Sequence, residues 1–170
     1  MIRLANEKDI EQINNLLYQV HKVHSDARPD LFKAGGKKYT DEELKEIIKD
    51  KEKPIFVYEA DGKIEGYAFC ILIDNTNENS LCDYKSLYID DLCVDENCRG
   101  RGIGKILYDY VLEYAKKIGC YNLTLNVWEG NDSAMRFYKN IGLKIQKIGM
   151  EKILWDNIFI LNLYKFNINI

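Results

Sequence analysis

Three consecutive segments between Ser86 and Ile118 decide the fold: SLYIDDLCV (86–94), DENCRGRGIGK (95–105) and ILYDYVLEYAKKI (106–118). The first is rich in β-branched and aromatic residues, which is typical of a strand. The third carries apolar residues in alternating steps of three and one, the spacing of one helix face, and Gly119 follows it as a stop signal. The sequence therefore predicts a strand, a glycine-rich turn and a helix from about 103 to 118.

The turn has three glycines spaced by two, flanked by Arg99, Arg101 and Lys105. A glycine-rich turn that leads into a helix exposes unpaired N–H groups, and the helix dipole favours an anion there. A dinucleotide fingerprint does not fit, because Leu107 stands where its third glycine would be. A Walker A loop fails as well, since Arg99 occupies its first glycine position and Ile106 follows the lysine. The turn is thus either an anion cradle of another kind or a tight turn with solvated arginines.

Outward from this stretch, periodicity and turn residues define the remaining elements. They are a strand at 2–4, a helix at about 6–24, a loop to about 36, a helix from Thr40 to about 50, a hairpin of 54–60 and 63–73 around Asp61-Gly62, a strand at 122–128, a helix that Asn131 caps and Gly142 ends, and a strand at 143–154. A crossover helix between the strands at 86–94 and 122–128 implies that these two strands are parallel. The predicted fold class is α/β, with a mixed, mostly antiparallel sheet and helices on both faces.

Composition narrows the function classes. The chain has 170 residues, with 46% hydrophobic and 30% charged, as expected for one compact domain. Its 24 Lys and Arg against 27 Asp and Glu give a net charge of -3, which argues against a nucleic-acid partner. We expect a cytoplasmic protein without a membrane segment, because no apolar run reaches the ~18 residues of a span. Five cysteines without a CxxC pair predict reduced thiols, and His21 with His24 lacks a third metal ligand, so we expect no metal.

The string Arg99-Gly-Arg-Gly-Ile-Gly104 resembles the [QR]-x-x-G-x-[GA] signature of the GNAT superfamily of acetyl-CoA-dependent N-acetyltransferases. The stretch from Asn126 to Leu143, with Asn-x-x-Ala-x-x-Phe-Tyr-x-x-x-Gly-Leu, resembles the end of the family's fifth strand and the helix after it. The resemblance covers about 1–154 and implies a GNAT-like sheet whose fourth and fifth strands form one parallel, splayed pair. It leaves 155–170 as an apolar extension, which we expect to pack on the domain or at a homodimer interface.

The resemblance implies acetyl-CoA as cosubstrate and assigns residues to it. The pyrophosphate would lie on the glycine-rich turn and the pantetheine arm along the preceding strand, with contacts from Asn131 and Tyr138. The implied cofactor-binding residues are Leu92, Cys93, Val94, Arg99, Gly100, Arg101, Gly102, Ile103, Gly104, Lys105, Asn131 and Tyr138.

The resemblance also implies a direct transfer in which Tyr138 protonates the departing thiolate. An acceptor ammonium must lose a proton before it attacks, so a carboxylate, directly or through water, is the expected base. Strand alternation predicts that Asp90 and Asp91 lie on opposite faces, and the resemblance favours Asp90, with Asp91 and water as alternatives. Cys93 is not expected to act as a nucleophile, because no His or cation near it in the sequence would lower its pKa.

Net negative charge favours a small cationic acceptor amine, of the polyamine or aminoglycoside type. The predicted acceptor-binding residues are His24, Asp26, Asp30, Asp90 and Glu129. The alternatives are a peptide or protein amine, either an N-terminus or a lysine, and, from another class, a non-catalytic coenzyme A binding or sensor module.

Overall fold

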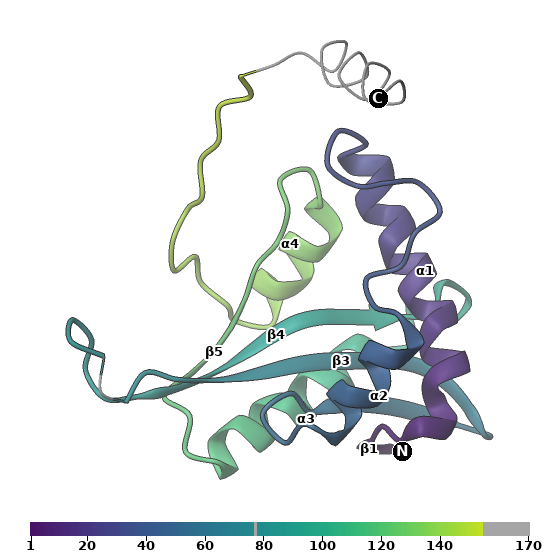
Figure 1. The fold of residues 1–170 in the computed structure, drawn as a ribbon, viewed down its shortest axis with the longest axis horizontal. Helices are drawn as coiled ribbons and strands as arrows, with labels where there is room; N and C mark the ends of the chain where they lie inside the picture. Colours follow the sequence, from purple (N-terminus) through teal and green to yellow (C-terminus); the bar gives the residue numbers. More distant parts are fainter. Residues whose placement is uncertain (77, 155–170) are drawn as a thin grey trace, which may run out of the picture. The chain divides into compact units, whose positions relative to one another are not determined.

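The structure, a computed structural model, describes residues 1–76 and 78–154 (Figure 1). Residues 1–131 form one compact unit, and the described residues from 132 to 154 belong to a second. The first unit contains β1 (Ile2–Leu4), the short 3-10 helix η1 (Glu7–Asp9), α1 (Ile10–Ala27), α2 (Asp41–Lys49), β2 (Ile55–Ala60), β3 (Lys63–Asp74), β4 (Lys85–Val94), η2 (Glu96–Cys98), α3 (Ile103–Lys117) and β5 (Asn122–Leu125). The described part of the second unit contains α4 (Asp132–Asn140).

The sheet of the first unit has the order β1-β2-β3-β4-β5. Neighbouring strands from β1 to β4 are antiparallel, and β4 pairs with β5 in parallel, from Ser86 opposite Asn122 to Ile89 opposite Leu125. The predicted mixed sheet with one parallel pair is confirmed, because α3 returns the chain to the end where β4 began. The ladder ends at Ile89 although β4 continues to Val94, so the predicted splay is confirmed as well.

Local sequence signals explain the element boundaries. Asp61 and Gly62 both have positive φ, 51° and 75°, as the tight turn of the β2–β3 hairpin requires. Thr40 caps α2 through the backbone N–H of Glu43, whose carboxylate in turn accepts from the Thr40 N–H. Helix α1 runs one turn further than predicted, to Ala27, and the Arg28 N–H closes it on the His24 carbonyl at 2.8 Å.

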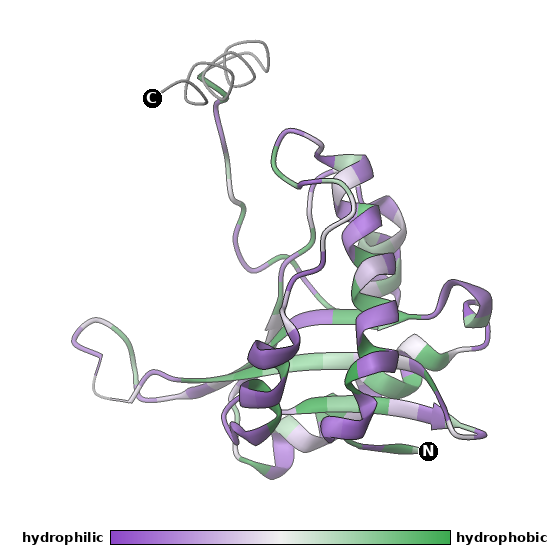
Figure 2. Cartoon of the chain, turned by 45° about the vertical axis from the view of Figure 1, so that its right-hand side comes forward, coloured by the Kyte–Doolittle hydropathy of each residue, from purple (hydrophilic) through white to green (hydrophobic). Residues whose placement is uncertain are grey.

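Helices cover both faces of the sheet, as predicted. Helices α1 and α2 pack on one face, and α3 packs on the other (Figure 1). Figure 2 shows hydrophobic residues concentrated along the central strands. Each fully buried Leu or Ile contributes about 1.5–3 kcal/mol, so these layers hold the strands in place. The α1–α2 side includes Ile13, Leu16, Leu17, Leu44, Val57, Tyr67, Phe69 and Cys93; the α3 side includes Leu92, Val94, Cys98, Ile103 and Leu107.

Two predicted strands differ from the structure. The strand predicted to run to Trp128 ends at Leu125. The strand predicted at 143–154 is wrong, because these residues, which belong to the second unit, have no regular secondary structure. Alternation of apolar and polar residues is a local pattern, whereas a strand also needs a neighbour that accepts and donates its backbone hydrogen bonds.

Candidate active site

The glycine-rich turn adopts the conformation that an anion cradle needs. Gly100 and Gly102 both have φ of +80°, in the left-handed region that disfavours side chains, and Gly102 is the N-cap of α3. No side chain caps this helix and its first turn holds no acidic residue, so its first N–H groups are available to a ligand. Arg99, Arg101 and Lys105 are exposed around it. The turn therefore fits a pyrophosphate, which would meet backbone N–H groups and positive charge together.

Ion pairs and hydrogen bonds attach this turn to the sheet. Arg101 contacts the buried carboxylate of Glu65 on β3 at 2.9 Å, and this guanidinium holds the pKa of Glu65 below its usual value. The Arg99 Nε donates to the Val94 carbonyl at 3.3 Å. Buried Ile103 anchors the first turn of α3 on the sheet. The backbone of the turn is thus fixed before any ligand binds.

Beyond Ile89, β4 has β3 on one edge and no strand among the described residues on the other. The open stretch comprises residues 90–94, and the side chains of Leu92 and Val94 pack toward α3 while Cys93 packs toward α1. What this stretch offers to a ligand is therefore the unpaired backbone edge of β4, and not a surface made of side chains. An extended ligand with amide groups, such as a pantetheine arm, could add to this edge as a strand would.

Asp90 and Asp91 lie on the same face of the sheet, so the prediction that they face opposite sides is wrong. Asp91 is opposite Phe69 and Ile89 is opposite Cys70, which leaves Asp90 as the extra residue of a β-bulge. A bulge resets the alternation, and both carboxylates then point toward the α1–α2 side. Hydrogen bonds from Tyr39 to Asp90 and from Tyr67 to Asp91 fix this arrangement.

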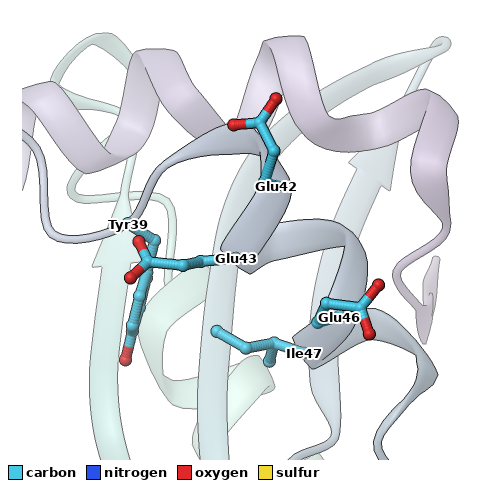
Figure 3. Close-up of a pocket in the computed structure, with 5 residues that line it drawn as sticks. All are labelled: Tyr39, Glu42, Glu43, Glu46 and Ile47. Atoms are coloured by element: carbon cyan, nitrogen blue, oxygen red, sulfur yellow. The ribbon is translucent and has the colours of Figure 1, made fainter.

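Asp90 is surrounded by donors from the segment before α2. Lys38 Nζ and the Tyr39 hydroxyl each lie 2.6 Å from Asp90 Oδ2. The Tyr39 ring stacks on Phe69 with centroids 5.4 Å apart, and burial together with the Asp90 carboxylate raises the pKa of Tyr39. Tyr39 also lines a pocket with Glu42, Glu43, Glu46 and Ile47; Figure 3 shows its hydroxyl at the end of the ring away from Glu42.

Asp91 lies deeper in the same face. Its Oδ2 accepts from the hydroxyl of fully buried Tyr67 at 2.8 Å. Burial raises the pKa of Asp91 to about 6, against the opposing effects of Tyr67 and Lys38. A carboxyl that titrates near neutral pH beside a second carboxylate is suited to accept and release a proton.

The predicted acceptor-binding residues have different partners. Asp30 makes a bidentate pair with Arg28 at 2.9 and 2.8 Å, Asp26 pairs with Lys22 on the exposed side of α1, and Glu129 is exposed in a turn. The pKa of His24 is lowered by desolvation first, and then by the charges of His21 and of Lys38, whose ammonium contacts Asp90.

His24 belongs to an aromatic wall. Its ring stacks on Phe32 at 5.3 Å, Phe32 meets Trp128 edge-on at 5.5 Å, and the Arg28 guanidinium lies 5.9 Å from the Trp128 ring centre. Trp128 follows β5 and is 44% exposed. This wall joins the end of α1 to the segment after β5.

Asn131 is the last residue of the first unit, and Tyr138 belongs to the second. The Asn131 N–H donates to the Trp128 carbonyl at 3.1 Å, next to the first turn of α4. Within the second unit, the Tyr138 ring contacts Phe137 with centroids 5.1 Å apart and its carbonyl accepts from Leu143 N–H. The roles assigned to Asn131 and Tyr138 rest on the family resemblance and stay predictions.

Cys93 is buried, and burial raises the pKa of its thiol to about 12. Such a thiol is a poor nucleophile at neutral pH, in line with the sequence prediction.

Three residues that contact the two carboxylates were not predicted from sequence: Lys38, Tyr39 and Tyr67. Lys38 and Tyr39 precede the Thr40 cap by two positions and one position, and about fifty residues separate them from Asp90. No sequence pattern signals such a long-range contact. Tyr67 could have been found, because it alternates with Phe69 in a predicted strand, but only the register of β3 against β4 places it beside Asp91.

A mixed sheet that splays after one parallel pair, with a glycine-rich turn leading into the crossover helix, is the architecture of GNAT acetyltransferases. The model of the Acetyltransferase (GNAT) family matches residues 17–143, and the chain belongs to this family. No helix in the described ranges is long and apolar enough to cross a membrane.

Individual relatives agree with this assignment. The chain is 29% identical to an uncharacterized N-acetyltransferase of Methanocaldococcus jannaschii over 86% of its own length and 62% of the relative's. It is 35% identical to a peptidyl-lysine N-acetyltransferase of Salmonella typhimurium over 61% and 60% of the two chains. It thus spans about three-fifths of the length of these two curated relatives. Among solved structures, a mutant of the BH1408 protein from Bacillus halodurans superposes with a TM-score of 0.87 and 30% identity, covering 91% of this chain and 99% of that one.

Proposed function

We propose that this chain is an N-acetyltransferase that moves the acetyl group of acetyl-CoA directly to a primary amine. The observation that carries the proposal is one continuous stretch of chain, 90–104. It begins with two carboxylates at the bulge, continues as an open backbone edge and ends in a cationic glycine-rich turn at a helix N-terminus. These three parts suit an amine, a pantetheine arm and a pyrophosphate in that order.

The residues of the turn, Arg99 to Lys105, would hold the pyrophosphate, and the backbone of Leu92 to Val94 would hold the arm. Asp90 or Asp91, directly or through water, would take the proton from the acceptor ammonium. Asp90 is the less buried of the two and already contacts an ammonium, that of Lys38. Tyr138 would protonate the departing thiolate, because a phenol is a suitable acid for a thiolate whose pKa is near 8.5.

A small cationic amine of the polyamine or aminoglycoside type is the acceptor that the net charge of -3 favours. A peptidyl lysine is the second candidate. Two observations favour it: a lysine ammonium already contacts Asp90, and a relative of 35% identity is named a peptidyl-lysine N-acetyltransferase. A coenzyme A binding module without turnover is the alternative from another class. A cytoplasmic location and a homodimer are further proposals from the sequence alone.

A thiol-release assay with acetyl-CoA tests the function across a panel of polyamines, aminoglycosides and lysine peptides. We expect saturable release of coenzyme A with at least one of these amines, and acetylated product in equal amount. Binding of acetyl-CoA without release on any amine would favour the module without turnover. Absence of binding would overturn the proposal as a whole.

A further inference from the structure

Lys38 places a primary ammonium where the proposed function needs an acceptor amine. Its Nζ is 2.6 Å from Asp90 Oδ2 and 5.4 Å from the centre of the Tyr39 ring. The side chain is 41% exposed, whereas the Asp90 side chain is 15% exposed. The ammonium therefore contacts a largely buried carboxylate from the solvent side, because the Lys38 side chain remains partly exposed.

The surroundings of this ammonium are those of an amine-binding site. Tyr39 supplies both a ring face and a hydroxyl that shares Asp90 Oδ2, and Asp91 lies next along the chain on the same face. Cations bind well to aromatic faces beside a carboxylate. Other lysines of the first unit pair with carboxylates elsewhere, as Lys22 with Asp26 on α1 and Lys105 with Asp109 on α3 illustrate.

Lys38 also lies next to the open edge of β4. Asp90 is the bulged residue at which the β4–β5 ladder has just ended, so its carboxylate is at the start of the stretch 90–94. An acyl group carried on an arm along that edge would come to the same end of the strand as the Lys38 amine. Proximity of this kind converts a bimolecular acylation into an effectively intramolecular one.

We propose that Lys38 is acetylated by acetyl-CoA bound to its own chain. The inference rests on the proposed function. Asp90 takes one proton from the Lys38 ammonium, the freed Nζ forms a bond to the acetyl carbon, and the bond from that carbon to sulfur breaks. The nitrogen loses a second proton as the amide forms; of the two protons, one ends on the sulfur, so that coenzyme A leaves as the thiol, and the other passes to solvent, which leaves Asp90 ionised. The amide no longer carries a charge, so the ion pair with Asp90 ends and the carboxylate becomes available to an external ammonium.

Isotope-labelled acetyl-CoA and peptide mass spectrometry of the full chain test this inference. Lys22 is the matched control, because it is also paired with a carboxylate and its side chain is more exposed, at 74%. Chemical acetylation by solution acetyl-CoA would label Lys22 at least as fast as Lys38. We expect Lys38 to be labelled about tenfold faster or more, as a result of proximity. An excess of desulfo-coenzyme A, which lacks the thiol, should suppress labelling of Lys38 and leave that of Lys22 unchanged.

Two further measurements complete the test. The first-order rate constant for Lys38 should not change when the enzyme is diluted, and Lys38→Arg, unlike Lys22→Arg, should remove the rapid mass increment from the intact chain. Labelling of Lys38 no faster than Lys22, or a rate that falls in proportion to dilution, would overturn the inference. The amine panel run in parallel separates the two proposals: turnover on a free amine with Lys38 unlabelled leaves the proposed function standing and removes self-acetylation alone.

Discussion

Replacement of Asp91 by Asn should change how stability depends on pH. Burial raises the pKa of this carboxyl from the ordinary 3.8 to about 6 in the folded protein. A group whose pKa is raised on folding stabilises the folded state fully below the unfolded pKa, and this contribution is lost as pH rises through the folded pKa. The change from 3.8 to about 6 corresponds to at most about 3 kcal/mol of unfolding free energy.

Urea unfolding of the parent chain and Asp91→Asn measures this effect. The quantity to follow is the stability of the variant minus that of the parent, at about pH 3.5 and at about pH 7.5, on either side of the expected transition. The pH-independent cost of the substitution cancels between the two conditions, and titration of the other carboxyls cancels between the two proteins. We expect the difference to move in favour of the variant by up to about 3 kcal/mol as pH rises.

Tyr67→Phe is the matched variant. The Tyr67 hydroxyl donates to Asp91 and acts to lower the pKa of that carboxyl, so its loss should move the transition to a higher pH. A stability difference between Asp91→Asn and the parent that stays constant across this range would refute the view that Asp91 is a desolvated carboxyl. It would also remove the reason to regard Asp91 as a base near neutral pH.

The remaining predictions concern binding, catalysis and the C-terminal segment. Acetyl-CoA should raise the melting temperature of the parent chain, and Gly102→Val should abolish that shift; Gly119→Val, which places the same side chain at a similar φ of +78° after α3, should lower stability but keep the shift. Tyr138→Phe should lower the rate constant of acetyl transfer by ~10² to 10⁴ with little change in acetyl-CoA affinity, and a parent-like rate with a good amine would exclude the tyrosine as the acid. Asp90→Asn should shift the pH–rate profile toward the pKa of the acceptor amine, because the free amine then has to form in solution; an unchanged profile would assign the base to Asp91 or water. Deletion of 155–170, which lies outside the described residues, should lower stability or solubility, and an unchanged melting point and sedimentation mass would show that the segment is dispensable.

Much of the fold could be predicted from sequence because its signals are local. The Asp61-Gly62 turn, the Thr40 cap and the spacing of apolar residues after Gly102 each act within one turn or one strand. The parallel pair followed from the length of the connection between β4 and β5. The family signature then singled out the turn at 99–104, whose role in cofactor binding stays a prediction.

The arrangement of the acceptor side could not be predicted in the same way. Alternation within β4 gives the correct faces only while the strand is regular, and the bulge at Asp90 depends on the register with β3. The contacts of Lys38 and Tyr39 with Asp90 depend on how the segment before α2 packs on the sheet. For 143–154 the local alternation predicted a strand, but the structure has no strand there.

The five residues after the end of the β4–β5 ladder also bear on solubility. A strand edge with free N–H and C=O groups is a template on which another chain can add, and natural proteins protect such edges with charge and irregularity. Here the exposed edge begins with two consecutive carboxylates and a bulge, at Asp90 and Asp91. Both features hinder a second copy from pairing in register, while a flexible ligand arm, which has no side chains to clash with them, can still enter. Substitution of the two aspartates by apolar residues should therefore promote self-association as well as impair catalysis.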